Sequence, residues 1–316
     1  MGKRKQRPKA GRWGKRKKDK RDWKAYNQKQ IGRGEFLLPV NILSEWKPGL
    51  ERLNRNKVGR PYRYPQILLE ALGFWKCFCK MDYRTVQGVC RQMAILLNWP
   101  ASPYFSTINR RLLALGRERY MKRDQVKAGK TVFGIWDGTG MKVCNRGEWL
   151  HYKKKGLRKG FVRVSFVTDA KTGKVLDYTV TTEKGGEKRS VKPMLKRVSK
   201  HHKVEKVFGD GLYDTNKNFD ELKKRKIKPA IKIRKNAVDG PPYPKPEMNA
   251  RLAEVKKYLR WGYKEWAKKR QYGQRWRVEG SFSRLKGYFG EYVFSKGMKH
   301  IQAEMGLKVY CLNQMV

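Results

Sequence analysis

The strongest constraint on this chain is its unbalanced charge. It carries 77 Lys and Arg against 27 Asp and Glu, a net charge of +50 over 316 residues. A surface with so few opposite charges repels itself and attracts polyanions. Surfaces of thermophilic proteins are also highly charged, but they pair both signs in networks. The composition therefore predicts nucleic-acid binding through phosphate neutralisation, with an affinity that depends strongly on salt.

The excess charge is spread along the chain rather than confined to one tail. Residues 1–22 hold twelve basic residues and two acids, which is typical of a disordered basic arm, and the rest still carries 65 basic against 25 acidic residues. Hydrophobic residues make up 39% of the chain, enough for a core. No stretch has the length and apolarity of a membrane span, and five cysteines without paired spacing do not suggest a disulfide framework. We expect a cytoplasmic, nucleoid-associated protein.

Residues 23–123 are predicted to form an all-α domain. A last helix capped by Ser106 or Thr107 would present Arg110 and Arg111 beside an apolar stripe. Three short helices ending this way indicate a helix-turn-helix-like DNA-binding domain, whose last helix enters a major groove. A small helical packing domain gives the same pattern, so both interpretations stay open. The apolar stripes of the first two helices are Ile67, Leu68, Ala71, Trp75 and then Val86, Val89, Met93, Leu96.

Residues 124–316 are predicted to form an α/β domain with a mixed sheet. A buried strand over 131–136 ends at Asp137, and alternating residues from 162 to 180 indicate two more strands of an antiparallel meander. The order continues as helix 190–199, strand 204–208, helix 219–226, strand 230–233, a proline-rich insertion over 236–270, and helices 274–289 and 301–312. This is the order of an RNase H-like fold.

Two acids in this basic chain follow apolar strands. Asp137 and Asp210 each come directly after such a run, where desolvation disfavours a charged carboxylate. Carboxylates brought together on neighbouring strands repel each other, and Mg²⁺ or Mn²⁺, which prefer oxygen ligands, relieve that repulsion. Either aspartate taken singly could instead be a turn residue before glycine.

A third acid, Glu279, has the right helical neighbours. At about 100° per residue, Tyr272, Arg275, Glu279 and Lys286 fall within roughly 60° of one another on one helix face. Such a face would place phosphate-binding groups beside a metal ligand. Glu279 alone could be no more than a solvated ion pair with Arg275. The apolar residues that would pack this helix lie about a quarter turn away: Val278, Phe282, Leu285 and Phe289.

The spacing of these residues resembles a known family. Two, three and six residues separate Tyr272, Arg275, Glu279 and Lys286. That spacing is similar to the signature of one branch of the DDE transposases of bacterial and archaeal insertion sequences. Residues 136–140 resemble the first aspartate motif of this family and residues 209–214 the second, and the resemblance extends from 22–27, with Arg33 and Gly34, to the carboxyl end.

The resemblance implies a chemistry for these residues. Asp137, Asp210 and Glu279 would hold two Mg²⁺ or Mn²⁺ ions, water would release a 3′-OH end, and that end would attack a target strand by transesterification. Arg275 and Lys286 would stabilise phosphate oxygens, with Tyr272 as a positioning hydrogen bond. The partners implied are double-stranded DNA, both as element ends and as target, and a second copy of the chain in a synaptic dimer.

Three functional hypotheses remain open at this stage. The chain is an active transposase, a catalytically idle DNA-binding relative, or a metal-dependent nuclease of the same fold. Within the insertion, Trp261 or Trp266 could stack on a flipped base, although a tryptophan there is more often part of the core. No structural zinc site is expected, because the Cys and His spacings do not match one.

Overall fold

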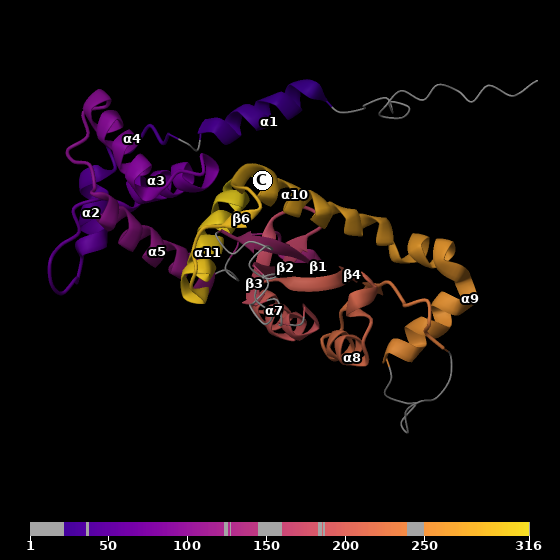
Figure 1. Ribbon diagram of the computed structural model, residues 1–316. Helices are drawn as coiled ribbons and strands as arrows, with labels where there is room; N and C mark the ends of the chain where they lie inside the picture. Colours follow the sequence, from indigo (N-terminus) through magenta and orange to yellow (C-terminus); the bar gives the residue numbers. More distant parts are fainter. Residues whose placement is uncertain are drawn as a thin grey trace, which may run out of the picture.

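The computed structural model describes residues 22–35, 38–122, 126, 128–144, 160–182, 185, 187–238 and 250–315. The helices between residues 46 and 121 lie at one end, the sheet lies in the middle, and α9 (Ala250–Arg270) lies at the other end (Figure 1). The predicted basic arm up to residue 21 and the prolines of the insertion lie outside the described residues. No helix of the described part has the length and apolarity needed to cross a membrane.

The first third of the described chain is all helical, as predicted. Asp82 caps α4 by accepting hydrogen bonds from the backbone N–H groups of Arg84 and Thr85, at 2.8 and 3.0 Å. The first predicted stripe is largely buried, but the second is buried only at its start, since Val86 is buried, Val89 and Met93 are half-buried, and Leu96 is 75% exposed. The helix bounds are α1 Trp23–Glu35, α2 Trp46–Asn54, α3 Gln66–Phe78, α4 Tyr83–Leu96 and α5 Phe105–Met121.

One mixed sheet follows, which confirms the predicted α/β class. Its strand order is β3-β2-β1-β4-β5, with β6 pairing β1. The pairs β1–β2 and β2–β3 are antiparallel, which confirms the predicted meander, whereas β4 and β5 run parallel to β1. The bounds are β1 Thr131–Val143, β2 Phe161–Asp169, β3 Val175–Thr182, β4 Lys203–Gly209, β5 Lys228–Ile231 and β6 Tyr292–Val293.

Helices cover both faces of this sheet. On one face, Val132 and Trp136 pack with α7 (Glu187–His201) and α8 (Asn216–Lys224). On the other, Ile135 and Phe166 pack with α10 (Arg277–Phe289) and α11 (Met298–Gln314). Successive side chains of a strand point to opposite faces, so the buried apolar side chains of β1 divide between these two cores.

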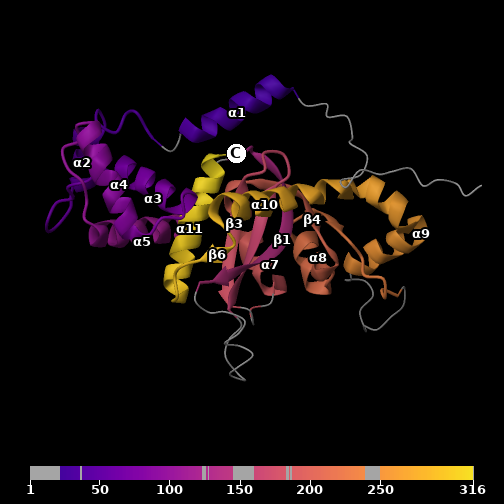
Figure 2. The ribbon, with the colours of Figure 1, turned by 45° about the horizontal axis from the view of Figure 1, so that its top comes forward.

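The last helix joins the sheet to the helical end of the molecule. α11 lies between α5 and β3 (Figures 1 and 2). Its contact with α5 is backbone to backbone, since a Cβ added at Gly306 would lie 2.1 Å from the carbonyl oxygen of Gly116, and one added at Gly116 would lie 2.2 Å from that of Ala303. Only glycine allows this approach. The helical core and the core on the α10 face of the sheet are therefore continuous.

Three predicted boundaries are wrong. α5 is not capped by Ser106 or Thr107, because the helix already begins at Phe105, after Tyr104, and no side chain caps it. β1 does not end at Asp137 but continues to Val143, because Gly138 keeps its antiparallel partner Ser165 on β2. The helix predicted over 274–289 is two elements, a 3₁₀ turn, η4 (Tyr272–Trp276), followed by α10, so Tyr272 and Arg275 do not share one continuous α-helix face with Glu279 and Lys286. Short 3₁₀ segments are common where an α-helix begins.

The glycine contact generates a stability prediction. Gly306→Ala should lower the free energy of unfolding by about 1–3 kcal/mol, because the added methyl group overlaps the Gly116 carbonyl and the two helices must separate. Urea unfolding followed by circular dichroism measures this loss. Gly88→Ala is the matched control, since its Cβ on α4 meets nothing within 4 Å and alanine favours a helix. An unchanged midpoint for Gly306→Ala would contradict the close packing.

Candidate active site

The register of two parallel strands places Asp137 and Asp210 together. Ile135 of β1 pairs with Phe208 of β4, and both side chains belong to the core on the α10 face. Asp137 and Asp210 each lie two residues further along their chains. With a side-chain period of two along a strand, Asp137 faces α10 as Ile135 does. Asp210 follows the last residue of β4, as the sequence predicted.

Local hydrogen bonds orient both carboxylates. Asp137 Oδ1 accepts a hydrogen bond from the Gly138 backbone N–H at 2.9 Å, and its side chain is 19% exposed. Asp210 caps the 3₁₀ turn η2 (Gly211–Tyr213), with Oδ1 accepting from the Leu212 N–H at 2.8 Å. Asp137 thus lies within β1 and Asp210 directly after β4, which are neighbouring interior strands of the sheet.

The turn η4 and the first turn of α10 complete the cluster. Arg275 Nη1 lies 3.5 Å from Asp137 Oδ2, and Arg275 Nη2 lies 3.1 Å from Glu279 Oε1. The i,i+4 ion pair that the spacing allowed is therefore present, and the same guanidinium also reaches Asp137. Lys286 follows Glu279 by two helical turns, roughly 10 Å along α10. No ion pair within the described residues joins Lys286 to these carboxylates.

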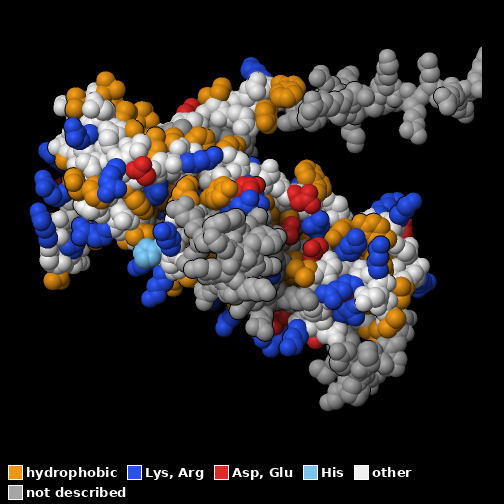
Figure 3. Space-filling model, viewed as in Figure 1, with side chains coloured by type: hydrophobic (Ala, Val, Ile, Leu, Met, Phe, Trp, Pro, Cys, Tyr) orange, Lys and Arg blue, Asp and Glu red, His pale blue; other side chains and the backbone are white. Residues whose placement is uncertain are grey.

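Burial and like charge make Asp137 hard to ionise. Desolvation raises the pKa of Asp137, the nearby carboxylates of Asp210 and Glu279 raise it further, and Arg275 opposes them only in part. Burial also raises the pKa of Tyr272 to about 12, with Asp210 and Asp137 nearby. Several acidic side chains gather near the middle of the face in Figure 3, while Lys and Arg are spread over both ends. The candidate site is a small anionic area on a cationic protein.

Tyr272 packs against a buried network of Trp266, Glu254 and Arg270 that the sequence did not predict. Its ring lies 5.3 Å from that of Trp266, which is fully buried and donates its Nε1–H to Glu254 at 2.8 Å. Glu254 also accepts two hydrogen bonds from Arg270, at 2.6 and 2.5 Å. Trp266 is therefore a core residue of α9 (Ala250–Arg270), which agrees with the more conservative of its two interpretations. Trp261 is half-buried, with Lys269 Nζ 4.2 Å from its ring centroid.

The second aspartate segment contains a structural acid as well as Asp210. Asp214 is buried and accepts hydrogen bonds from Arg251 Nε at 2.5 Å and Nη2 at 2.8 Å, and from the Arg234 backbone N–H at 3.0 Å. It therefore ties α9 to the loop after β4. The sequence gives no signal for this pairing, because Arg251 is one of many basic residues in that region.

The two arginines predicted to contact DNA lie elsewhere, on α5. Arg110 is exposed, whereas Arg111 is half-buried over the ring of Tyr62, 3.9 Å from its centroid. Burial lowers the pKa of Arg111. Because α11 lies between α5 and the sheet, these arginines form a surface separate from the carboxylates (Figures 1 and 2).

The chemistry of the cluster fits a hard divalent cation. Its donors are carboxylate oxygens, the ligands that Mg²⁺ and Mn²⁺ prefer. The carboxylates of Asp210 and Glu279 raise the pKa of Asp137, and a bound cation would offset this cost of ionising Asp137. Among the described residues, no three His, Cys, Asp or Glu side chains already stand at metal-ligand spacing. Arg275 instead supplies the positive charge between Asp137 and Glu279.

The electrostatics of Asp137 predict a pH-dependent gain in stability. Because the pKa of Asp137 is raised in the folded state, its charged form disfavours folding at neutral pH; this cost falls as the pH drops through the folded pKa and is gone below the pKa of the unfolded chain. Asp137→Asn should therefore raise the melting temperature near about pH 7 in EDTA, and the gain should shrink toward about pH 4. Thermal melts across that range measure the difference.

The exposed surface acid Asp220 on α8 provides the control. Asp220→Asn should change stability by no more than about 0.5 kcal/mol at any of these pH values. A melting temperature of Asp137→Asn that is lower than that of the unmodified protein at neutral pH would show that the Arg275 contact outweighs desolvation.

Acids on adjacent parallel strands, joined by a helix that brings a third acid and an arginine, define a candidate site for nucleic-acid chemistry. Comparison with known proteins agrees with this class. Residues 128–314 match a family described as "Transposase DDE domain", and residues 29–146 match a second family with the same description. The chain therefore belongs to the DDE transposases, as the sequence motifs suggested.

One similar solved structure is a cryo-EM structure of a piggyBac transposase synaptic complex with hairpin DNA. It is 11% identical, with a TM-score of 0.39 over 90% of this chain and 73% of that chain. A likeness of this degree carries no argument about the site or the substrate.

Proposed function

We propose that this protein is an active transposase that binds the ends of its insertion sequence, cleaves DNA to free 3′-OH ends and joins those ends to target DNA. The observation that carries the proposal is that Arg275 pairs with both Asp137 and Glu279, while the carboxylates of Asp210 and Glu279 are near enough to raise the pKa of Asp137. Membership of the DDE transposase family supports it. The net charge of +50 supports a polyanionic substrate.

The architecture supports a finer assignment of the two parts of the chain. We assign the sheet, with three antiparallel strands followed by two parallel ones in the order β3-β2-β1-β4-β5, to the RNase H-like class. The helices α3 to α5 are assigned to a helix-turn-helix-like DNA-binding domain. In that domain Arg110 on α5 is exposed for contact with DNA, while Arg111 stacks on Tyr62 and positions the helix.

The carboxylates would hold two Mg²⁺ or Mn²⁺ ions, which when bound activate the attacking oxygen and stabilise the leaving oxygen of a phosphodiester. The other residues act electrostatically. Arg275, 23% exposed beside the carboxylates, is placed to hold a nonbridging phosphate oxygen as negative charge develops on phosphorus. Lys286 would neutralise a further phosphate along α10. Tyr272, kept protonated by its raised pKa, would donate a positioning hydrogen bond.

Substitution of the acids tests this assignment. Asp137→Asn, Asp210→Asn and Glu279→Gln should abolish cleavage while DNA affinity survives, because each removes a metal ligand without removing a basic residue. Lys286→Ala should weaken both activities, since it removes a phosphate contact. Gel assays with a labelled element end measure cleavage and binding in parallel. Asp220→Asn serves as the control and should keep full activity, and a fully active Asp210→Asn would refute the assignment.

Binding of divalent ions can be tested without DNA. Mg²⁺ or Mn²⁺ should raise the melting temperature of the unmodified protein, because a ligand that binds only the folded state stabilises it by mass action. EDTA should remove the increase, and Asp137→Asn should reduce it strongly. Equal increases in the unmodified protein and in the variant would place the ions elsewhere.

Strand joining separates the transposase from the two other hypotheses. A transposase joins a pre-cut 3′-OH end to a target duplex, a nuclease of the same fold only nicks, and an idle DNA-binding relative does neither. The clustered acids favour the catalytic hypotheses over the idle one. Sequencing of the joined products identifies the target phosphate and shows whether two ends insert together, as a synaptic dimer requires.

A further inference from the structure

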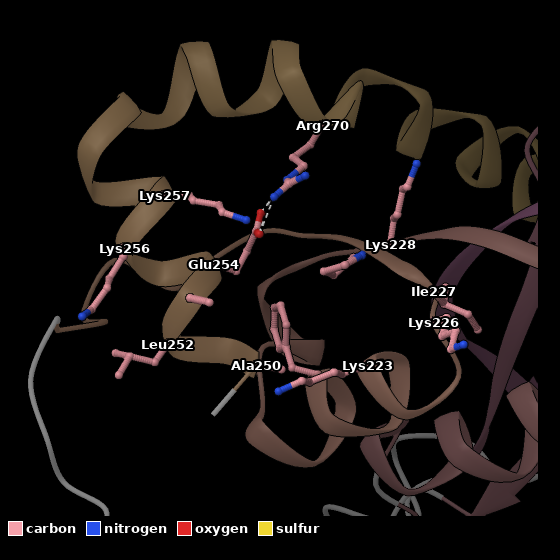
Figure 4. Close-up of a pocket in the computed structure, with 13 residues that line it drawn as sticks. Lys223, Lys226, Ile227, Lys228, Ala250, Leu252, Glu254, Lys256, Lys257 and Arg270 are labelled. Carbon is pink, nitrogen blue, oxygen red and sulfur yellow. Dashed lines mark hydrogen bonds and ion pairs between the residues drawn. The ribbon is translucent and has the colours of Figure 1, made fainter. Parts of the chain in front are cut away.

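A cationic cavity lies between α8, β5 and α9, and its lining residue Arg270 is two residues from Tyr272 of the candidate active site. Its volume is about 630 Å³, within the range of ligand-binding clefts. Figure 4 shows Glu254 and Lys257 from the first arm of α9 and Arg270 from the second arm pointing toward one another, with Lys223 across the cavity. The two arms meet at a kink at Gly262, where φ is 69°. No predicted site residue lines this cavity.

Positive charge dominates the cavity lining. Lys223, Lys226, Lys228 and Lys257 are exposed, and they line the cavity with Arg270. Glu254 is the only acid among the described lining residues. It is 3% exposed, and its oxygens already accept hydrogen bonds from Arg270 and Trp266. The positive charges of the lysines are therefore hardly neutralised by other residues of the cavity lining.

Helix dipoles account for only part of this charge. Lys223 lies in the last turn of α8, where a cation is favoured by the partial negative charge of the helix end. Lys228 is the first residue of a strand and Lys257 lies in the first arm of α9, so neither lies at a helix C-terminus whose partial negative charge would favour a cation. Like charges from two facing walls repel across the cavity. An anion that occupies the cavity would relieve that repulsion.

The cavity is physically connected to the candidate active site. Arg270 precedes Gln271 and Tyr272, and Gln271 Oε1 accepts a hydrogen bond from Lys206 Nζ on β4 at 2.9 Å. Lys206 has a lowered pKa, chiefly because of desolvation and then because Arg270 and Lys228 are close. Basic groups thus continue from the cavity to β4, the strand that Asp210 follows, and Trp266 bridges Glu254 and Tyr272.

We propose that this cavity binds backbone phosphates of the DNA duplex whose strand lies in the candidate active site, through Lys223, Lys228, Lys257 and Arg270. The inference rests on the proposed function, because it takes DNA as the substrate. Lysines on flexible stems contact phosphates as point charges, so this contact is independent of base sequence. It adds a DNA-binding surface separate from α5 and from the carboxylates.

Chemical protection tests the assignment directly. The full-length Asp137→Asn protein, which binds DNA without consuming it, is acetylated with and without a saturating mixed-sequence duplex, and each lysine is quantified by mass spectrometry. Lys223 and Lys257 should react several-fold more slowly with DNA bound. Lys196 and Lys200, exposed on α7 outside the cavity, should react at unchanged rates. Equal reactivity of Lys223 and Lys257 in both samples would overturn the proposal.

The salt dependence of binding gives a second measurement. Lys223→Gln/Lys257→Gln should lower the magnitude of the slope of log K against log[salt] by about 2, because each phosphate contact contributes about 0.9. Lys196→Gln/Lys200→Gln loses the same charge and should leave the slope nearly unchanged. Equal slopes for the two variants would contradict a specific contact at the cavity.

The same experiments distinguish this proposal from the proposed function. If the protein binds DNA but leaves Lys223 and Lys257 unprotected, only the cavity assignment fails. If no duplex binds at all, both fail. Inorganic pyrophosphate is included as a competitor, and protection by pyrophosphate without protection by DNA would identify a small-anion pocket and overturn the assignment to a DNA backbone.

Discussion

The parallel pairing of β1 with β4 is the constraint on which the candidate site depends. Because Ile135 is opposite Phe208, Asp137 and Asp210, each two positions further along its chain, come at one level of two neighbouring strands, and Asp137 lies on the α10 face. A one-residue slip of either strand would turn one aspartate toward α7 and α8. The glycine contact between α5 and α11 then joins the helical end to the same core. The strand register therefore sets the positions of Asp137 and Asp210, and the C-terminal helices set which side chains lie opposite them.

The few acids of this cationic protein include a group of carboxylates that repel one another. The protein is strongly cationic, yet Asp137, Asp210 and Glu279 are held close enough to raise the pKa of Asp137. Such a cluster lowers stability unless a cation joins it, and Arg275 provides one positive charge. Two other acids, Asp214 and Glu254, form buried ion pairs with arginines of α9 and hold that helix in place. Asp214 and Glu254 thus have a structural role, whereas Asp137, Asp210 and Glu279 are the acids available for chemistry.

Much of the fold and of the candidate site could be predicted from the sequence because local patterns are strong there. The meander follows from alternating residues such as Val162, Val164 and Phe166, and Asp210 from the Gly-Asp-Gly that ends β4. The predicted end of β1 at Asp137 is wrong because Gly138 is typical of a turn in sequence, whereas its pairing with Ser165 of β2 keeps it in the strand. The 3₁₀ turn at Tyr272 depends on burial against Trp266, a tertiary contact that no local spacing encodes. The cationic cavity was missed for the same reason, since its walls come from separate segments.

The most direct test of the account is cleavage of a labelled fragment that carries the end of the protein's own element, in Mg²⁺ and in EDTA, with the 3′ terminus of the product identified. The account predicts a nick at one defined phosphate that leaves a 3′-OH, present in Mg²⁺ and absent in EDTA. Tight binding without cleavage in either Mg²⁺ or Mn²⁺, or cleavage that persists in EDTA, would contradict it.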